Sequence, residues 1–228
     1  MDRVNLVSKM KSLIVVILFY LINFKVWDLL VDNQILGPRW AAFAVYTVLF
    51  ILTIALFHGH LKQSWNDFKA EISSPWRFFL EVVLWAVAGS LITSALIFLF
   101  NRLFGLDVLP GNQENVNDMV QELPAILSFV MMAIYAPIIE ELTFRHAIIG
   151  WVDPDNKTLL WIMTVISIVL FEQIHVMHPP EFFYYLPLSI ILTTIYQRHQ
   201  QNVWASILFH AFFNAMGFLF ILLGLIPN

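Results

Sequence analysis

The sequence predicts an all-α protein, a polytopic transmembrane helical bundle of about seven spans. Of its 228 residues, 60% are hydrophobic and only 12% are charged, and the mean hydropathy is +0.77. A soluble domain is about half apolar and about a quarter charged. Seven apolar stretches approach the roughly 20 residues that a helix needs to cross a bilayer. The chain has no cysteine and a net charge of −4, which excludes thiol chemistry and gives no basic surface for nucleic acid.

The expected spans follow one another with short connections. They cover residues 13–30, 40–57, 78–100, 123–142, 159–174, 182–196 and 203–226. The first is too long for the apolar region of a signal peptide, so we expect it to remain as a membrane helix. The fourth contains Pro124 and Pro137 and ends in acidic residues. The fifth and sixth are short, so their ends must extend into the polar residues beside them.

The distribution of lysine and arginine predicts a cytoplasmic N-terminus. With that orientation nine basic residues lie on the cytoplasmic side, and only Arg39 and Arg102 lie outside. The nine are Arg3, Lys9, Lys11, Lys62, Lys69, Arg77, Arg145, Lys157 and Arg198. We therefore expect an integral, multi-pass membrane protein.

Two regions of different character are expected within one integral membrane domain. Residues 1–118 contribute membrane spans and loops, and residues 119–228 form a helical core that holds the polar chemistry. The connection 58–77 has Trp65, Phe68 and Ile72 at spacings that suit an amphipathic interfacial helix. A simple connector explains that connection equally well.

The C-terminal region places polar and charged residues in apolar helices. They are Glu140, Glu141, Arg145, Glu172, His175, His210 and Asn214. Insertion scales give about 2.5–3.5 kcal/mol for an ionised residue at the centre of a membrane helix. Several such residues are tolerated together when they face one another around a polar cavity, and they are then candidates for function.

Their spacing supports a shared cavity. Three pairs lie four residues apart and so share a helix face: Glu141 with Arg145, Phe171 with His175, and His210 with Asn214. An ion pair would hold Glu141 in place. Glu140 points about 100° away from Glu141 and is free for another role.

In their order, these three patterns resemble the signature of the CAAX protease and bacteriocin-processing family, also called CPBP or Abi. The patterns are Glu140-Glu141-x-x-x-Arg145, Phe171-x-x-x-His175 and His210-x-x-x-Asn214. The family includes the type II CAAX prenyl endopeptidases and bacterial proteins linked to bacteriocin immunity. The resemblance covers roughly residues 120–220. Together with the cytoplasmic basic residues, it implies an integral, multi-pass protein of a bacterial plasma membrane.

The resemblance implies an intramembrane endopeptidase that uses a glutamate to activate water. Glu140 is then the general base, and His175 binds and orients the water. His210 and Asn214 donate hydrogen bonds to the developing oxyanion. Only the expected ion pair distinguishes Glu140 from Glu141 as the base.

The remaining members of the signature are expected to support the site. Glu141 and Arg145 are positional, and Phe171 packs. Glu172 lies outside the family pattern and is left out of the site. Each catalytic candidate also has a structural explanation without catalysis. Glu140 could mark a helix end, and His175 could be a hydrogen-bonded core histidine. His210 could be an interfacial residue, and Asn214 could form a polar contact between helices.

The expected depths of the catalytic candidates in the membrane do not agree with a shared site. In a simple seven-span layout Glu140 and His210 lie toward the cytoplasmic side, whereas His175 lies near the outer end of its helix. They meet only if the helices are staggered, tilted or bent. Pro137 offers a bend just before Glu140.

The residue types at the expected site leave two ways to activate water. We favour water activation without a metal, and the alternative is a zinc ion held by Glu140, His175 and His210. The substrate is a membrane-embedded or lipid-associated peptide within the bilayer, and nucleic acid is not a partner. Two other functions stay open, namely a non-catalytic bacteriocin immunity or scaffold protein and a proton-coupled transporter.

Overall fold

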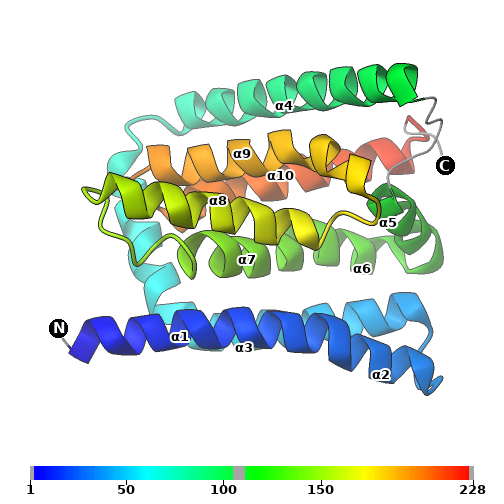
Figure 1. Cartoon of the computed structure of the whole chain (residues 1–228), viewed down its shortest axis with the longest axis horizontal. Coiled ribbons are helices and arrows are strands. Elements are labelled where there is room, and N and C mark those ends of the chain that lie inside the picture. The colour runs from blue at the N-terminus through cyan, green and yellow to red at the C-terminus, as the bar shows by residue number, and fades with distance from the viewer. Residues whose placement is uncertain (1–2, 105–110, 226–228) are drawn as a thin grey trace.

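The protein is an all-helical bundle in a computed structural model that describes residues 3–104 and 111–225, and no strand occurs in those ranges. Figure 1 shows the long helices lying side by side along one axis, with α1 starting at one end and α10 finishing at the other. The helices are α1 (Arg3–Tyr20), α2 (Trp27–Asp32), α3 (Pro38–Glu71), α4 (Pro75–Phe104), α5 (Gly111–Glu122), α6 (Ala125–Val130), α7 (Ala136–Glu140), α8 (Lys157–Gln173), α9 (Phe182–Arg198) and α10 (Val203–Leu222). We call the end where α1 starts the N-terminal end of the bundle.

Short turns of other helix types complete these elements. The π-helical turn η1 (Leu21–Val26) joins α1 to α2, and the 3₁₀ turn η4 (Pro179–Glu181) precedes α9. Two further π-helical turns, η2 (Met131–Tyr135) and η3 (Glu141–His146), flank α7. Elements α6 to η3 therefore form one continuous membrane helix, which we call the glutamate helix.

Each of the seven expected spans coincides for most of its described residues with a helix, and these helices differ in length. Five continuous helices among the described residues are long and apolar enough to cross a membrane. They are Lys9–Asp32, Pro38–Glu71, Pro75–Leu103, Ala125–His146 and Val203–Leu222. The fifth and sixth expected spans form α8 and α9, which have 17 residues each.

Apolar side chains face outward as well as inward. On α4, Leu84, Leu91 and Phe98 recur every seven residues and are 69%, 66% and 72% exposed. A stripe of this kind suits lipid, because a monomeric soluble protein rarely exposes so large an apolar patch. The buried side of α3 follows a spacing of four, with Val45, Leu49 and others facing the core.

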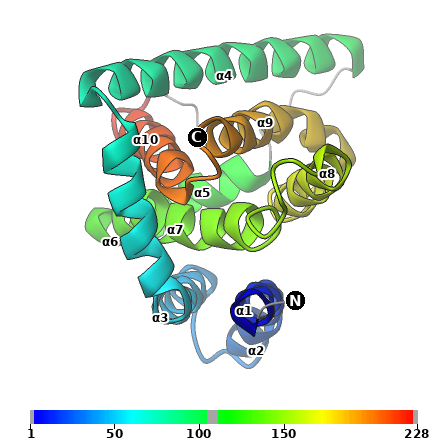
Figure 2. The same ribbon diagram turned by 90° about the vertical axis from the view of Figure 1, so that its left-hand side faces the viewer.

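The second half of α3 turns across the N-terminal end of the bundle, as Figure 2 shows. The expected interfacial segment 58–77 is thus helical up to Glu71 and lies over the helix ends. Three hydrogen bonds hold it there. Trp204 Nε1 donates to the carbonyl of Leu61 at 2.8 Å, and Ser64 and Asn202 exchange two further hydrogen bonds at 2.8 and 2.9 Å.

Local sequence signals set the start of two helices, α8 and α10. Asn156 precedes α8, and its side chain accepts a hydrogen bond from the backbone N–H of Leu159 at 3.1 Å. Asn202 does the same for α10 through the N–H of Trp204 at 3.0 Å. Asparagine is a favoured N-cap because its oxygen satisfies a backbone donor that the helix leaves free.

Within the glutamate helix, Pro137 lies just after a π-helical turn. Proline has no N–H and cannot complete the usual backbone hydrogen bond inside a helix. A π-helical turn next to it accommodates the local change in the hydrogen-bond ladder. The glutamate helix also runs four residues past the expected limit at Leu142, which places Glu140 about two turns before its end.

We predict that Gly150→Ala destabilises the fold. A Cβ atom at Gly150 would lie 2.6 Å from the carbonyl oxygen of His146 and 2.7 Å from the hydroxyl of Tyr196. Such overpacking costs about 1–3 kcal/mol, so the midpoint of thermal unfolding in detergent should fall. Gly217→Ala is the control, because nothing lies within 4 Å of its added Cβ. Equal midpoints for the two variants would contradict the prediction.

Candidate active site

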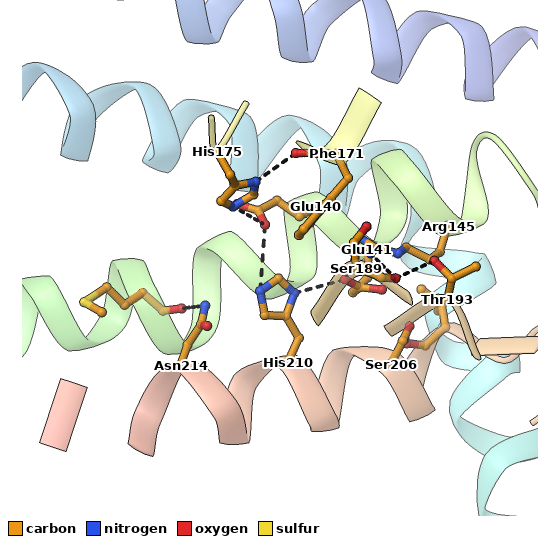
Figure 3. Close-up of polar contacts among 12 residues, drawn as sticks. Glu140, Glu141, Arg145, Phe171, His175, Ser189, Thr193, Ser206, His210 and Asn214 are labelled. Carbon is orange, nitrogen blue, oxygen red and sulfur yellow. Dashed lines mark hydrogen bonds and ion pairs between the residues drawn. The ribbon is translucent and has the colours of Figure 1, made fainter. Parts of the chain in front are cut away.

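The structure brings the polar residues of three separate patterns together inside the bundle, as Figure 3 shows. Glu140, Glu141 and Arg145 come from the glutamate helix. His175 follows the end of α8, and His210 comes from α10. Glu140, Glu141, Arg145 and His210 are all at most 3% exposed. The protein therefore has one buried polar centre where the sequence predicts a cavity.

A stagger between helices resolves the difficulty over depth. Figure 1 shows α8 starting beyond the end of the glutamate helix, toward the N-terminal end of the bundle. Because α8 has only 17 residues, it ends beside Glu140. His175 Nε2 lies 3.9 Å from Glu140 Oε2, and His210 Nε2 lies 3.8 Å from the same oxygen.

Glu141 and Arg145 form the expected ion pair. Arg145 Nη1 lies 3.1 Å from Glu141 Oε1, and both side chains are fully buried. The guanidinium also lies 4.1 Å from the centre of the Phe171 ring, and its Nη2 donates to the carbonyl of Ser189 at 3.4 Å. Charge, ring and carbonyl together hold Arg145 inside the bundle.

His210 connects the two glutamates. Its Nδ1 lies 3.0 Å from Glu141 Oε1, while its Nε2 faces Glu140. An ionised carboxylate can only accept hydrogen bonds, so the Nδ1 atom carries the hydrogen in this contact. Glu141 therefore orients the imidazole and decides which nitrogen is presented to Glu140.

His175 is oriented by the backbone of its own helix. Its Nδ1 lies 2.8 Å from the carbonyl oxygen of Phe171, one turn earlier. A carbonyl oxygen also only accepts, so Nδ1 donates and Nε2 presents a lone pair toward Glu140. Two acceptors, a carboxylate oxygen and an imidazole nitrogen, thus face each other, and a water molecule beside them can donate to both.

Asn214 is held by a different contact. It lies one turn after His210 on α10, and its amide Nδ2 donates to the carbonyl of Met132 at 3.0 Å. Among the described residues no hydrogen bond joins Asn214 to Glu140 or His210. One amide hydrogen of Asn214 is used by Met132, and the second stays available.

Sequence reasoning missed Tyr46 and gave no role to Glu172. The Tyr46 hydroxyl donates to Glu140 Oε1 at 3.5 Å from α3. Tyr46 lies in an ordinary apolar span outside the three patterns, so no local signal marks it. Glu172 is 1% exposed and is buried near Ser189 and Arg145, which makes it part of the interior.

The described residues do not form a preassembled metal-binding cluster. Among residues 3–104 and 111–225, no three histidine, aspartate or glutamate side chains are arranged as a group that could hold a metal ion. The expected ligands Glu140, His175 and His210 meet around Glu140 Oε2, at distances of 3.8–3.9 Å from the two imidazole nitrogens. The two imidazoles each direct Nε2 at Glu140, an orientation that a nitrogen ligand also needs.

Fold and site together define a multi-pass membrane protein built around a buried pair of glutamates. A family model described as type II CAAX prenyl endopeptidase Rce1-like matches residues 122–216. The UPF0177 protein YbdI of Lactococcus lactis subsp. lactis (strain IL1403) is 30% identical over 182 residues, which cover 77% of this chain and 94% of YbdI. The chain belongs to this family, the CAAX protease and bacteriocin-processing or Abi family, and is an integral membrane protein.

Two other relatives are more distant or match a shorter segment. A UPF0177 protein encoded in the abiGi 5′ region of Lactococcus lactis subsp. cremoris is 37% identical over 97 residues, 42% of this chain and 39% of that protein. YdiL of Bacillus subtilis (strain 168), whose name marks it as a proposed membrane peptidase, is 27% identical over 141 residues, 58% of this chain and 53% of YdiL. No solved structure matches the chain.

We predict that Arg145→Met strongly destabilises the protein. Removing one partner of a buried ion pair leaves the other charge uncompensated and costs about 3–5 kcal/mol. Arg198→Met is the matched control, because Arg198 pairs with Glu81 at 3.1 Å but is 65% exposed. An exposed pair contributes at most about 1 kcal/mol. Thermal unfolding in detergent should separate the two variants, and similar losses would show that the buried pair has no special weight.

Proposed function

We propose that this protein is an intramembrane endopeptidase in which Glu140 activates water to cleave a membrane-embedded or lipid-associated peptide. Membership of a family of membrane proteases supports the reaction class. The observation that supports the mechanism is the pair of acceptors at the site, Glu140 Oε2 and His175 Nε2, which lie 3.9 Å apart. Together they can bind one water by both of its hydrogens and draw electron density toward its oxygen.

In the first step the water oxygen attacks the carbonyl carbon of the scissile peptide bond. Glu140 takes the proton that the water loses, and a tetrahedral oxyanion forms. Glu140 then returns this proton to the leaving nitrogen as the carbon–nitrogen bond breaks. The same carboxyl group thus acts first as base and then as acid. Tyr46 donates to its other oxygen and holds it in position.

The oxyanion requires hydrogen-bond donors. Asn214 can supply its second amide hydrogen, since the first is used by the carbonyl of Met132. His210 can donate from Nε2 only when both ring nitrogens carry a hydrogen, because Glu141 already takes the hydrogen at Nδ1. A donor of this kind contributes about 10²–10³ in rate.

Glu141 is the better candidate for the positional role. Its Oε1 is engaged by both Arg145 and His210 at 3.0–3.1 Å, and its side chain is fully buried. A carboxylate in two such contacts is a poor proton acceptor for water. The contacts of Glu140 are all longer, at 3.5–3.9 Å, which leaves its oxygens accessible to a water molecule.

Zinc is the alternative means of activating the water. Glu140, His175 and His210 would be its ligands, and zinc would supply a Lewis acid that lowers the pKa of a bound water molecule. The residue types suit zinc. A chelator therefore belongs in the first experiment.

We predict that Glu140→Gln abolishes cleavage while the fold is retained. The amide keeps the size of the side chain but cannot accept a proton from water, so the rate should fall by at least about 10²–10⁴. The assay is cleavage of a reporter peptide library, prenylated and unprenylated, by the purified protein in lipid. Each variant is measured with and without a zinc chelator, and thermal unfolding confirms folding.

The outcomes separate the mechanisms and the rival functions. Loss of cleavage in the variant alone supports glutamate-activated water, and loss with the chelator as well supports zinc. Peptide binding without cleavage by the unmodified protein would contradict the proposal and favour a scaffold. Proton-coupled uptake that Glu140→Gln stops would favour a transporter.

A further inference from the structure

A second polar site lies at the N-terminal end of the bundle, apart from the glutamate pair. It is a cavity of about 360 Å³, within the size range of small ligand pockets. Its walls come from the second half of α3, from the turn that follows the glutamate helix, and from the turn between α9 and α10. The residues that line the cavity include His60, Asp67, Glu71, His146, Tyr196 and Gln201.

The walls of this cavity are fixed. The hydrogen bonds between Ser64 and Asn202 tie α3 to the turn before α10, as described for the fold. His199 Nδ1 lies 3.0 Å from Glu71 Oε1 and adds a second link across the same gap. His60 and His146 stack with ring centres 3.6 Å apart. These contacts hold the cavity open.

Several polar atoms that line the cavity are buried without a hydrogen-bond partner among the described residues. They are the Tyr196 hydroxyl, His60 Nε2 and Gln201 Nε2. Tyr196 is 0% exposed. A buried polar group without a partner is destabilising, so a cluster of them around one cavity indicates a polar ligand.

The backbone at the same place is strained. Gln200 and Gln201 have φ angles of 54° and 60°, in the left-handed region that non-glycine residues seldom adopt. This conformation is destabilising for a residue that carries a Cβ atom. Strain of this kind clusters at functional sites, and both residues line the cavity.

The charge of the lining indicates the sign of the ligand. Asp67 and Glu71 are acidic, and no lysine or arginine is found among the residues that line the cavity. Glu71 lies beside the imidazole of His199, and Asp67 lies near that of His60. The two carboxylates and the Tyr196 hydroxyl can accept hydrogen bonds from the donors of a lysine or arginine side chain, whereas Gln201 Nε2 is itself a donor and does not take part in that contact.

The cavity lies within reach of a peptide bound at Glu140. His146 follows Glu140 by six residues, which is about 9 Å along a helix axis. An extended peptide covers that distance in about three residues. Tyr196 lines the cavity and is fully buried inside the bundle. A peptide that leaves Glu140 toward this end of the bundle therefore brings a side chain near the cavity.

We propose that this cavity is a specificity site that binds a basic side chain of the peptide substrate, about three residues from the scissile bond. The proposal rests on the peptidase function above and names the class of substrate, a membrane segment followed by lysine or arginine. Membrane segments are flanked by such residues on their cytoplasmic side. The N-terminal end of this bundle is the side expected to be cytoplasmic.

The test measures binding separately from cleavage. Glu140→Gln protein in neutral lipid nanodiscs is titrated with two labelled peptides, an apolar segment ending in two lysines and the same segment ending in two glutamines. We expect tighter binding of the lysine peptide, and Asp67→Asn should reduce that preference by about two- to fivefold. Asp155→Asn is the matched control, because it removes an exposed charge from the loop before α8 and does not line the cavity.

A second variant addresses the interior of the cavity. Tyr196→Phe removes only the unpartnered hydroxyl and keeps the buried ring, so the fold should persist while binding of the lysine peptide weakens. Equal binding of the two peptides, or equal effects of Asp67→Asn and Asp155→Asn, would overturn the proposal. Cleavage without a preference for lysine would reject this site and leave the peptidase function standing. If the protein prefers the lysine peptide but cleaves no peptide, the binding site stands and the peptidase function is rejected.

Discussion

The site depends on one buried ion pair, Glu141 with Arg145. Arg145 lies against the ring of Phe171, whose carbonyl orients His175. Glu141 orients His210 through Nδ1. Both imidazoles that face Glu140 are therefore positioned, directly or through one neighbour, by this pair. A substitution in the ion pair therefore changes the surroundings of Glu140 through the two imidazoles, without a hydrogen bond between Glu140 and Arg145.

The two adjacent glutamates show how one helix separates two tasks. Neighbouring residues on a helix point in directions about 100° apart. Glu141 faces Arg145 and is held tightly, while Glu140 faces the imidazoles at longer distances. Tight contacts suit a structural anchor, and looser contacts suit a group that must exchange a proton with water.

Much of this arrangement could be predicted from the sequence, because spacing along a helix is a local property. The fold class, the seven helical stretches and the Glu141–Arg145 contact all follow from apolar length and from residues four apart. Relations between helices could not be predicted. The stagger of α8, the contact of Tyr46 and the cavity near Tyr196 depend on how distant segments pack, and no local pattern encodes that.

The shortness of α8 also has a consequence for the surrounding lipid. A helix of 17 residues rises about 26 Å, less than the roughly 30 Å of a hydrocarbon core. Its outer face is apolar, with Trp161 70% exposed and Val165 53% exposed. A bilayer meets a short apolar surface by becoming thinner beside it. Where the bilayer thins beside α8, headgroups and bulk water lie closer to His175 than they would beside a longer helix, so we expect the thickness of the host membrane to affect the chemistry at this site.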